Sequence, residues 1–201
     1  MKKLLIIAAA MLIGLQANAQ LRADGGFMHA MESFKWNDSS ADGFSLDGAY
    51  LGAKYNISLY NLVEGLSVEP GANLSLLFGK EHLAILPYSI SEIGINIPVH
   101  ARYTYEITND FSIYGLFGPT LQYGLDLRAK DGNNSYRLYG DNNTGVSRNP
   151  FNLYLGLAAG IEVAQMIHVN VGFDFGLLNM STTSRLGINR NQLKIGVGYI
   201  F

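Results

Sequence analysis

The sequence contains no cysteine and, after its first 19 residues, no long apolar run. Without cysteine, a disulfide framework and a lipid-modified N-terminal cysteine are both excluded. No later apolar run reaches the roughly 18 residues that a transmembrane helix needs. Charged residues make up 15% of the chain, whereas soluble domains carry about 25%. Because the hydrophobic content is nevertheless 48%, apolar residues must alternate with small and polar ones.

Neither sign of charge dominates, since the formal net charge is −2. Lysine and arginine form no basic run, which argues against a nucleic-acid partner. Two clusters of Asp, Asn and Gly, at residues 131–134 and 141–145, lack the spacing of a calcium-binding loop and are explained by turn formation. We therefore expect no metal and no cofactor.

The first 19 residues have the features of a secretory signal peptide. A short basic start precedes an apolar stretch, residues 4–15, that is too short to span a bilayer. Ala17 and Ala19 form an A-x-A cleavage motif. A retained helical anchor is the alternative interpretation. We expect an exported protein with a signal peptide at residues 1–19 and one domain at residues 20–201.

The last eleven residues alternate between large apolar side chains and small or polar ones. The apolar set is Leu193, Ile195, Val197, Tyr199 and Phe201, and between them lie Gln192, Lys194, Gly196 and Gly198. A period of two indicates a β-strand with two different faces. Outer-membrane barrels end on such a strand, because the last strand closes against the first and its aromatics lie at the membrane interface. The pattern also resembles the C-terminal signal recognised by the barrel-assembly machinery.

Seven earlier segments show the same alternation. They are residues 21–31 (weakly), 49–59, 66–78, 91–107, 111–127, 151–163 and 167–175. The connections alternate in length: 32–47, 79–90, 129–150 and 179–190 are long and polar, whereas 60–65, 108–110 and 164–166 are short. Outer-membrane barrels have long loops outside the cell and short periplasmic turns. The sequence therefore predicts an all-β fold, a single eight-stranded antiparallel up-and-down transmembrane β-barrel with both termini periplasmic.

The composition of the polar face indicates that it lines the inside of the barrel. A soluble barrel such as a lipocalin also alternates, but its polar face would be rich in Lys, Glu and Asp. Here that face is rich in glycine: Gly52, Gly71, Gly94, Gly118, Gly124, Gly156, Gly160, Gly172, Gly196 and Gly198. Small residues suit the crowded interior of an eight-stranded barrel. The large apolar side chains of the other face then contact lipid, with aromatic girdles at both interfaces.

Two prolines do not fit regular strands. Pro98 and Pro119 lie inside predicted strands, where each removes a hydrogen-bond donor from the ladder. We expect a β-bulge at one or both, which would invert the inward and outward alternation beyond it.

Four segments resemble a family of small outer-membrane β-barrel domains: INIPVHARY (95–103), FGPTLQYGL (117–125), LYLGLAAGIE (153–162) and FGLLNM (175–180). Members are often labelled porin-family proteins and are similar to eight-stranded barrels of the OmpX and OmpA type. The resemblance covers the whole predicted mature chain. It implies a bacterial outer-membrane location and supplies no catalytic residues.

Charged residues on the inner face must pair, because an unpaired buried charge is costly. The main candidates are Lys54, Glu69, His100, Arg102, Glu162, Asp174 and Lys194, and the alternation adds Glu106, Asp126, Arg128 and His168. We interpret them as an interior network that fills the barrel. The function that follows is that of a structural or surface-interaction component of the cell envelope, not an enzyme. The alternative is a narrow porin for small solutes.

A membrane-embedded lipid-modifying enzyme is a more distant alternative. Its candidate residues, near the expected outer rim and without motif spacing, are His82 with Glu81, Ser89 and Ser91, and His29 with Glu32 and Ser33. Expected partners are outer-membrane lipid and lipopolysaccharide, the barrel-assembly machinery, and a possible extracellular ligand at loops 32–47 and 129–150, with the protein a monomer. Trp36, with Phe34 and Phe44, either contacts lipopolysaccharide or a partner, or packs the first loop.

Overall fold

The computed structural model describes residues 19–36, 39–83, 86–132, 134–140, 148–182 and 186–201. These residues form nine strands: β1 (Ala19–Trp36), β2 (Ser39–Ser58), β3 (Leu66–Leu83), β4 (Leu86–Thr108), β5 (Phe111–Asp131), β6 (Asn134–Arg137), β7 (Phe151–Val163), β8 (Ile167–Gly176) and β9 (Leu186–Ile200). In this part of the chain no helix is long and apolar enough to cross a bilayer.

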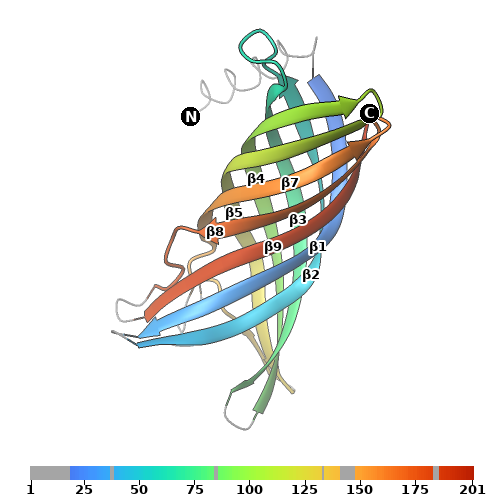
Figure 1. Cartoon of the computed structure of the whole chain (residues 1–201). Coiled ribbons are helices and arrows are strands. Elements are labelled where there is room, and N and C mark those ends of the chain that lie inside the picture. The colour runs from blue at the N-terminus through green and yellow to red at the C-terminus, as the bar shows by residue number, and fades with distance from the viewer. Residues whose placement is uncertain (1–18, 37–38, 84–85, 133, 141–147, 183–185) are drawn as a thin grey trace, which may run out of the picture.

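Hydrogen bonds join eight of the described strands into a closed ring (Figure 1). The order is β4-β3-β2-β1-β9-β8-β7-β5, and β4 also pairs with β5. All the pairs are antiparallel, and β9 closes against β1. The ninth strand, β6, pairs with the end of β5 as a short hairpin. The predicted all-β, antiparallel, up-and-down barrel is confirmed.

The strands are strongly staggered around the ring. A path of paired residues that leaves β1 at Ala19 returns to β1 at His29, ten residues further along. It passes through Ile57, Val68, Ala101, Phe117, Leu157, Phe173 and Leu193. With eight strands, this stagger gives a tilt of about 40° from the barrel axis and a lumen that side chains can fill.

The two ends of the barrel differ. At one, which we call the turn end, lie Ala19, Phe201 and three short connections at residues 59–65, 109–110 and 164–166. The opposite end, which we call the hairpin end, carries the other connections (Figure 1). The predicted loops at 32–47 and 79–90 are wrong, because β1 and β2 extend to Trp36 and Ser39, and β3 and β4 to Leu83 and Leu86. Polar composition suggested loops, but strands that extend beyond the apolar band can be polar on both faces.

One bulge inverts the alternation near the hairpin end of β5. Ile93 pairs with Asp126 and Gly94 with Gly124, so Leu125 is the extra residue. Beyond it Leu127 is fully buried and points inward, whereas the side chain of Arg128 is 53% exposed. The predictions of a lipid-facing Leu127 and of inward-facing Asp126 and Arg128 are therefore wrong.

The expected bulges at the prolines do not form. Beside Pro98, the pairs Pro70–Val99 and Asn73–Asn96 keep one register with β3. Pro119 pairs with Leu155 in the same register as its neighbours. A proline removes one donor from the ladder but inserts no residue, so the pairing continues on both sides.

The outward face is apolar. Its exposed side chains include Leu51, Leu74, Leu76, Ile97, Val99, Ile113, Leu157, Val169, Ile195 and Val197. Aromatic residues gather toward both ends, with Tyr103, Tyr105, Tyr199 and Phe201 near the turn end and Phe78, Tyr123, Phe151 and Phe175 toward the hairpin end. On β5, the thirteen residues from Phe111 to Tyr123 span about 30 Å along the axis. That distance matches an apolar band between two interfacial girdles.

Candidate functional site: the barrel interior

Four charged side chains cross the lumen near the turn end, and we call them the turn-end cluster: Arg22 (β1), Glu69 (β3), Arg102 (β4) and Glu162 (β7). Glu162 accepts hydrogen bonds at 2.5 Å from both arginines. Glu69 lies 3.0 Å from Arg102 and 3.3 Å from Arg22. The guanidinium of Arg102 also stacks 3.5 Å from the ring centroid of Tyr114. All four charged residues are buried, and their two positive and two negative charges balance.

Two further ion pairs lie in the middle of the barrel, and we call them the mid-barrel pairs. Lys54 donates to Asp24 at 2.8 Å, between β2 and β1. Lys194 pairs with Asp174, between β9 and β8. On β4, His100 is hydrogen-bonded through Nε2 to the Thr120 hydroxyl at 3.1 Å.

A third group, the hairpin-end cluster, consists of Glu32, Glu92, Arg148 and Arg190. Arg190 lies 2.5 Å from Glu32 and 2.7 Å from Glu92. Arg148 lies 2.6 Å from the second oxygen of Glu32. The four side chains are at most 3% exposed, so here too the lumen holds buried and balanced charge.

Neutral polar side chains join this cluster to the barrel wall. The Tyr139 hydroxyl donates to Glu92 at 2.9 Å. Tyr154 donates to Gln122 at 2.5 Å and accepts from Gln192 at 3.0 Å. Burial, together with the negative charge of Glu92, raises the pKa of Tyr139 above that of an ordinary phenol. Tyr139 therefore stays a neutral donor beside the carboxylate.

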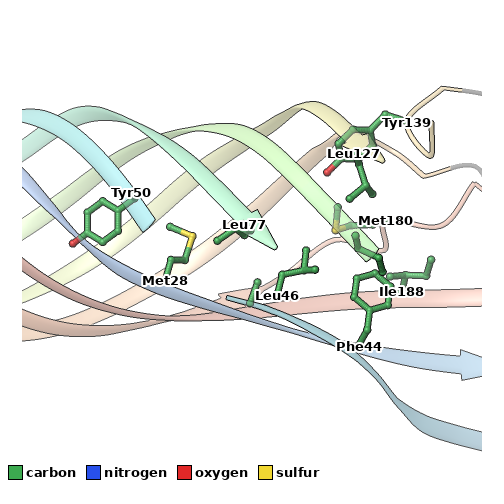
Figure 2. Close-up of a cluster of buried hydrophobic side chains, with 11 residues drawn as sticks. Met28, Phe44, Leu46, Tyr50, Leu77, Leu127, Tyr139, Met180 and Ile188 are labelled. Atoms are coloured by element: carbon green, nitrogen blue, oxygen red, sulfur yellow. The ribbon is translucent and has the colours of Figure 1, made fainter. Parts of the chain in front are cut away.

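Apolar side chains fill the lumen at the hairpin end (Figure 2). This apolar core comprises Met28, Ala30, Phe44, Leu46, Tyr50, Leu77, Ile90, Leu127, Tyr139, Met180 and Ile188. The sequence predicted a polar interior along the whole barrel, and this apolar core was not predicted. The alternation in residues 49–59 and 66–78 had already placed Tyr50 and Leu77 on the inner face, and these two large side chains were the available signal.

Segments outside the barrel strands cover this end. The amide of Leu138 donates to Leu127, and that of Arg148 donates to the carbonyl of Leu138. Asn149 donates to Met180, which in turn donates to Ile188. These backbone bonds hold the described parts of the β5–β7 and β8–β9 connections together, so that Tyr139, Arg148 and Met180 enter the lumen.

Inward tyrosines lie against glycines. A Cβ added to Gly196 would lie 2.1 Å from the Tyr50 hydroxyl oxygen, and one added to Gly160 would lie 2.4 Å from the Tyr114 ring. A Cβ added to Gly124 would lie 2.3 Å from the Tyr139 ring. The glycine-rich inner face therefore accommodates the rings that cross the lumen.

A solvent-open cavity of about 1130 Å³ occupies the mouth at the turn end. Its inner lining includes Arg22, Ser67 and Glu162, and its outer lining includes Glu64 and Glu106. No mid-barrel or hairpin-end charge lines it among the described residues. Glu106, predicted inside the barrel, is exposed at this mouth.

The structure brings most predicted interior residues into contact. Glu69, Arg102 and Glu162 share the turn-end cluster, Lys54, Asp174 and Lys194 form the mid-barrel pairs, and His100 and His168 are buried. Sequence reasoning did not select Arg22, Asp24, Glu32, Glu92, Arg148 and Arg190 for this network. Arg22 and Asp24 lie in the weakly patterned first strand. Glu32, Arg148 and Arg190 lie in stretches expected to be loops, which gave no inward signal.

The first set of residues considered for catalysis, around His29, does not assemble. His29 faces outward and contacts Asp47 at 2.6 Å, whereas Glu32 lies inside the barrel. The side chains of Glu81 and His82 lie outside the described residues, as do the predicted signal peptide before Ala19 and most of the Asx-rich clusters. In the described part of the chain, no three His, Cys, Asp or Glu side chains are placed to hold a metal ion.

The three aromatic residues of the predicted first loop lie in two different environments. Phe34 and Phe44 pack together with ring centroids 6.0 Å apart, and the Arg148 guanidinium lies 4.6 Å from the Phe44 ring centroid. Trp36, at the end of β1, is 55% exposed. Phe34 and Phe44 therefore pack the barrel interior, and Trp36 alone remains at the surface.

A closed ring of tilted strands, apolar outside and ion-paired inside, defines a transmembrane β-barrel. The chain matches the outer membrane protein beta-barrel domain family over residues 5–201, and it belongs to that family. The resemblance seen in the sequence is thus confirmed, and the family places the protein in the bacterial outer membrane.

Several solved structures are similar. Ail of Yersinia pestis is 13% identical, with 92% of this chain and 99% of that chain covered and a TM-score of 0.45. Neisserial surface protein A is 13% identical, with 91% and 97% covered and a TM-score of 0.49. OprG of Pseudomonas aeruginosa is 16% identical, with 92% and 96% covered and a TM-score of 0.46. No curated protein matches the chain.

Proposed function

We propose that this protein is a closed barrel of the outer membrane, with a structural or surface-interaction role rather than a transport or catalytic one. The observation that carries the proposal is that side chains from opposite walls meet across the lumen at both ends. Arg22 and Arg102 share Glu162 at the turn end. At the hairpin end Arg190 of β9 meets Glu92 of β4, the strand on the opposite side of the ring. Between them lie the mid-barrel pairs.

The energetics favour a lumen that stays closed. Opening a path for solute would separate buried ion pairs, and removing the partner of one buried charge costs about 3–5 kcal/mol. At the hairpin end a solute would also have to displace the apolar core, which is held by the backbone bonds of Leu138, Arg148 and Met180. Ion clusters and apolar core therefore block the lumen in series.

The proposal includes an orientation. A signal peptide at residues 1–19 would leave the mature N-terminus in the periplasm, at the turn end where β1 begins. Short periplasmic turns and longer outer connections agree with this orientation. The hairpin end, with Trp36 and the tips of the five long strands β1 to β5, would then face the cell exterior and provide the surface for any partner.

Conductance tests the closed lumen. The mature chain, refolded in detergent and inserted into planar bilayers, should give little or no steady conductance. A variant with Tyr154→Ala, Arg190→Ala and Gln192→Ala should show more frequent brief current openings than the unmodified protein, because it removes side chains that cross one level of the lumen and leaves the other levels in place. A matched triple variant on the outward face of β5, Ile113→Ala, Phe117→Ala and Leu121→Ala, should stay closed.

A stable open pore in the unmodified protein would overturn the proposal and favour the narrow porin. Heat-induced loss of gel mobility, measured on each preparation, shows that the inserted protein is folded. If the interior variant does not fold, the conductance of the unmodified protein is sufficient to test the closed lumen.

A further inference from the structure

Four basic side chains lie together on the outside of the hairpin end, and we call them the basic patch: Lys80 (β3), Arg128 and Lys130 (β5), and Arg137 (β6). Lys80 pairs with Ser89, and Ser89 pairs with Lys130, so one row crosses three strands. In the next row Ser91 pairs with Arg128, which pairs with Arg137. Adjacent strands lie about 5 Å apart, so the four basic groups share one small area. All four side chains are exposed.

The bulge at Leu125 creates this patch. Without the extra residue, the alternation of β5 would turn Asp126, Arg128 and Lys130 into the lumen. With it, the same side chains face outward, and Leu127 fills the lumen instead. Bulges often redirect side chains at functional positions.

The patch carries uncompensated positive charge. Asp126 contacts Arg128 at 2.6 Å and Arg137 at 3.4 Å, in each case at the Nε nitrogen. Arg128 and Arg137 are 53% and 60% exposed. One terminal nitrogen of Arg137 donates to the Leu125 carbonyl at 3.3 Å, and the remaining terminal nitrogens of the two guanidiniums are available to solvent. Like charges directly opposite each other in a sheet repel. Among the described side chains, one carboxylate against four basic groups leaves room for an anion.

The patch adjoins the apolar band. Phe78 pairs with Ser91 in the same row as Arg128, and Ile93 and Leu125 lie next toward the turn end. All three are exposed. A ligand that fits this arrangement has an anionic head beside the patch and acyl chains along the band below it. On the opposite side of the ring, Lys35 of β1 is exposed at the same end but pairs with Ser40 and Gly187, not with basic residues.

From this arrangement we propose that the basic patch binds the phosphate groups of outer-leaflet lipopolysaccharide, on the β3–β6 side of the barrel. The inference rests on the orientation given above, with the hairpin end outside the cell. Guanidinium groups bind phosphate through paired, charge-assisted hydrogen bonds, and the lysines add point charges. Asp126 acts as a positioning residue that holds both guanidiniums by their Nε side.

The test uses the mature chain refolded in detergent micelles and native mass spectrometry to follow lipid binding. The probes are diphosphorylated lipid A, the same lipid A after removal of both phosphates, and inorganic phosphate as competitor. The unmodified protein should bind the phosphorylated form at least about tenfold more tightly, because several charge-assisted hydrogen bonds are lost without phosphate. The variant Arg128→Gln with Lys130→Gln should lose that preference, whereas Lys35→Gln, the matched control, should keep it.

Equal binding of the two lipid A forms would overturn the proposal, and so would a preference unchanged by the double variant. Displacement of lipid A by an equal concentration of inorganic phosphate would overturn the assignment to lipid. If the double variant does not refold, Arg137→Gln alone tests the same contact from β6. None of these outcomes affects the conductance test, because the patch lies outside the lumen.

Discussion

Tyr139 shows how one side chain can tie a connecting segment to the barrel interior. It lies just beyond β6, outside the membrane-spanning strands, and is buried with its ring against Gly124 and its hydroxyl on Glu92. Burial and the Glu92 charge raise its pKa above the ordinary value. The unfolded phenol loses its proton near pH 10, but the folded one retains it. Its contribution to stability is therefore full below about pH 10 and is lost as the pH rises further.

We expect Tyr139→Phe to cost about 1 kcal/mol at pH 8, from the lost hydrogen bond to Glu92. Above about pH 10 the difference should shrink and reverse, because only the unmodified protein loses up to about 1.4 kcal/mol per pH unit at this residue. Urea midpoints measured by circular dichroism between pH 8 and pH 11.5 check this. Tyr136→Phe, at an exposed residue of β6, is the control and should follow the unmodified protein. Parallel curves for Tyr139→Phe and the unmodified protein would contradict the assignment.

The sequence predicted which charged residues face the lumen better than it predicted which of them form ion pairs. Alternation placed Glu69, Arg102 and Glu162 on the inner face, and they do meet in one cluster. Their contact depends on the ten-residue stagger of the ring, which sets which residues share a level across the lumen. Alternation within a strand contains no information on stagger. Arg148 gave no signal at all, because it comes from an irregular connection.

Neighbouring strands pack closely because inward tyrosine rings lie against glycines on adjacent strands. Tyr50 of β2 pairs with Gly26 of β1, which pairs with Gly196 of β9, so its ring lies across two neighbouring strands. A methyl group on Gly196 would lie 2.1 Å from the Tyr50 hydroxyl oxygen. Because this contact spans β1 and the strand that closes on it, it stabilises the seam of the barrel.

Gly196→Ala should therefore lower the unfolding free energy by about 1–3 kcal/mol, as expected for overpacking. Adding Tyr50→Phe, which removes the clashing oxygen, should restore part of the loss. Gly115→Ala is the matched control, since its methyl group would face outward with one contact at 3.9 Å. Urea unfolding in detergent measures all four proteins. Equal stability of Gly196→Ala and Gly115→Ala would show that the contact does not constrain the seam.

Element boundaries were harder to predict than element identity. Alternation found all eight barrel strands because the apolar band requires it. Beyond the band, both faces of a hairpin meet water or loop residues, so β1 to β4 continue through stretches whose composition suggests loops. The bulge gave a misleading signal, since Leu125 and Leu127 are two residues apart and suggest one continuous face. Only the pairing with Ile93 and Gly94 reveals that they point to opposite sides.

The whole molecule depends on one closure. β9 pairs with β1 from Arg22–Ile200 to Trp36–Leu186, and without this seam both strands would expose unpaired backbone groups to lipid. The amide of Phe201 extends the seam by donating to Leu21 at 2.9 Å. Its ring contacts that of Tyr199 edge to face, with centroids 5.0 Å apart, and is 69% exposed on the lipid side. Phe201 thus adds little burial to the folded barrel.

That exposure separates assembly from stability. If Phe201 is part of the signal for the barrel-assembly machinery, its deletion should lower the amount of folded barrel in outer-membrane fractions severalfold. The same variant should refold in detergent nearly as well as the unmodified protein, because only one hydrogen bond and one exposed ring contact are lost. Leu62→Ala, at an exposed residue of the turn at 59–65, is the control and should leave both yields unchanged. Unaltered outer-membrane yield after deletion, or equal losses in the membrane and in detergent, would assign Phe201 no separate role in assembly.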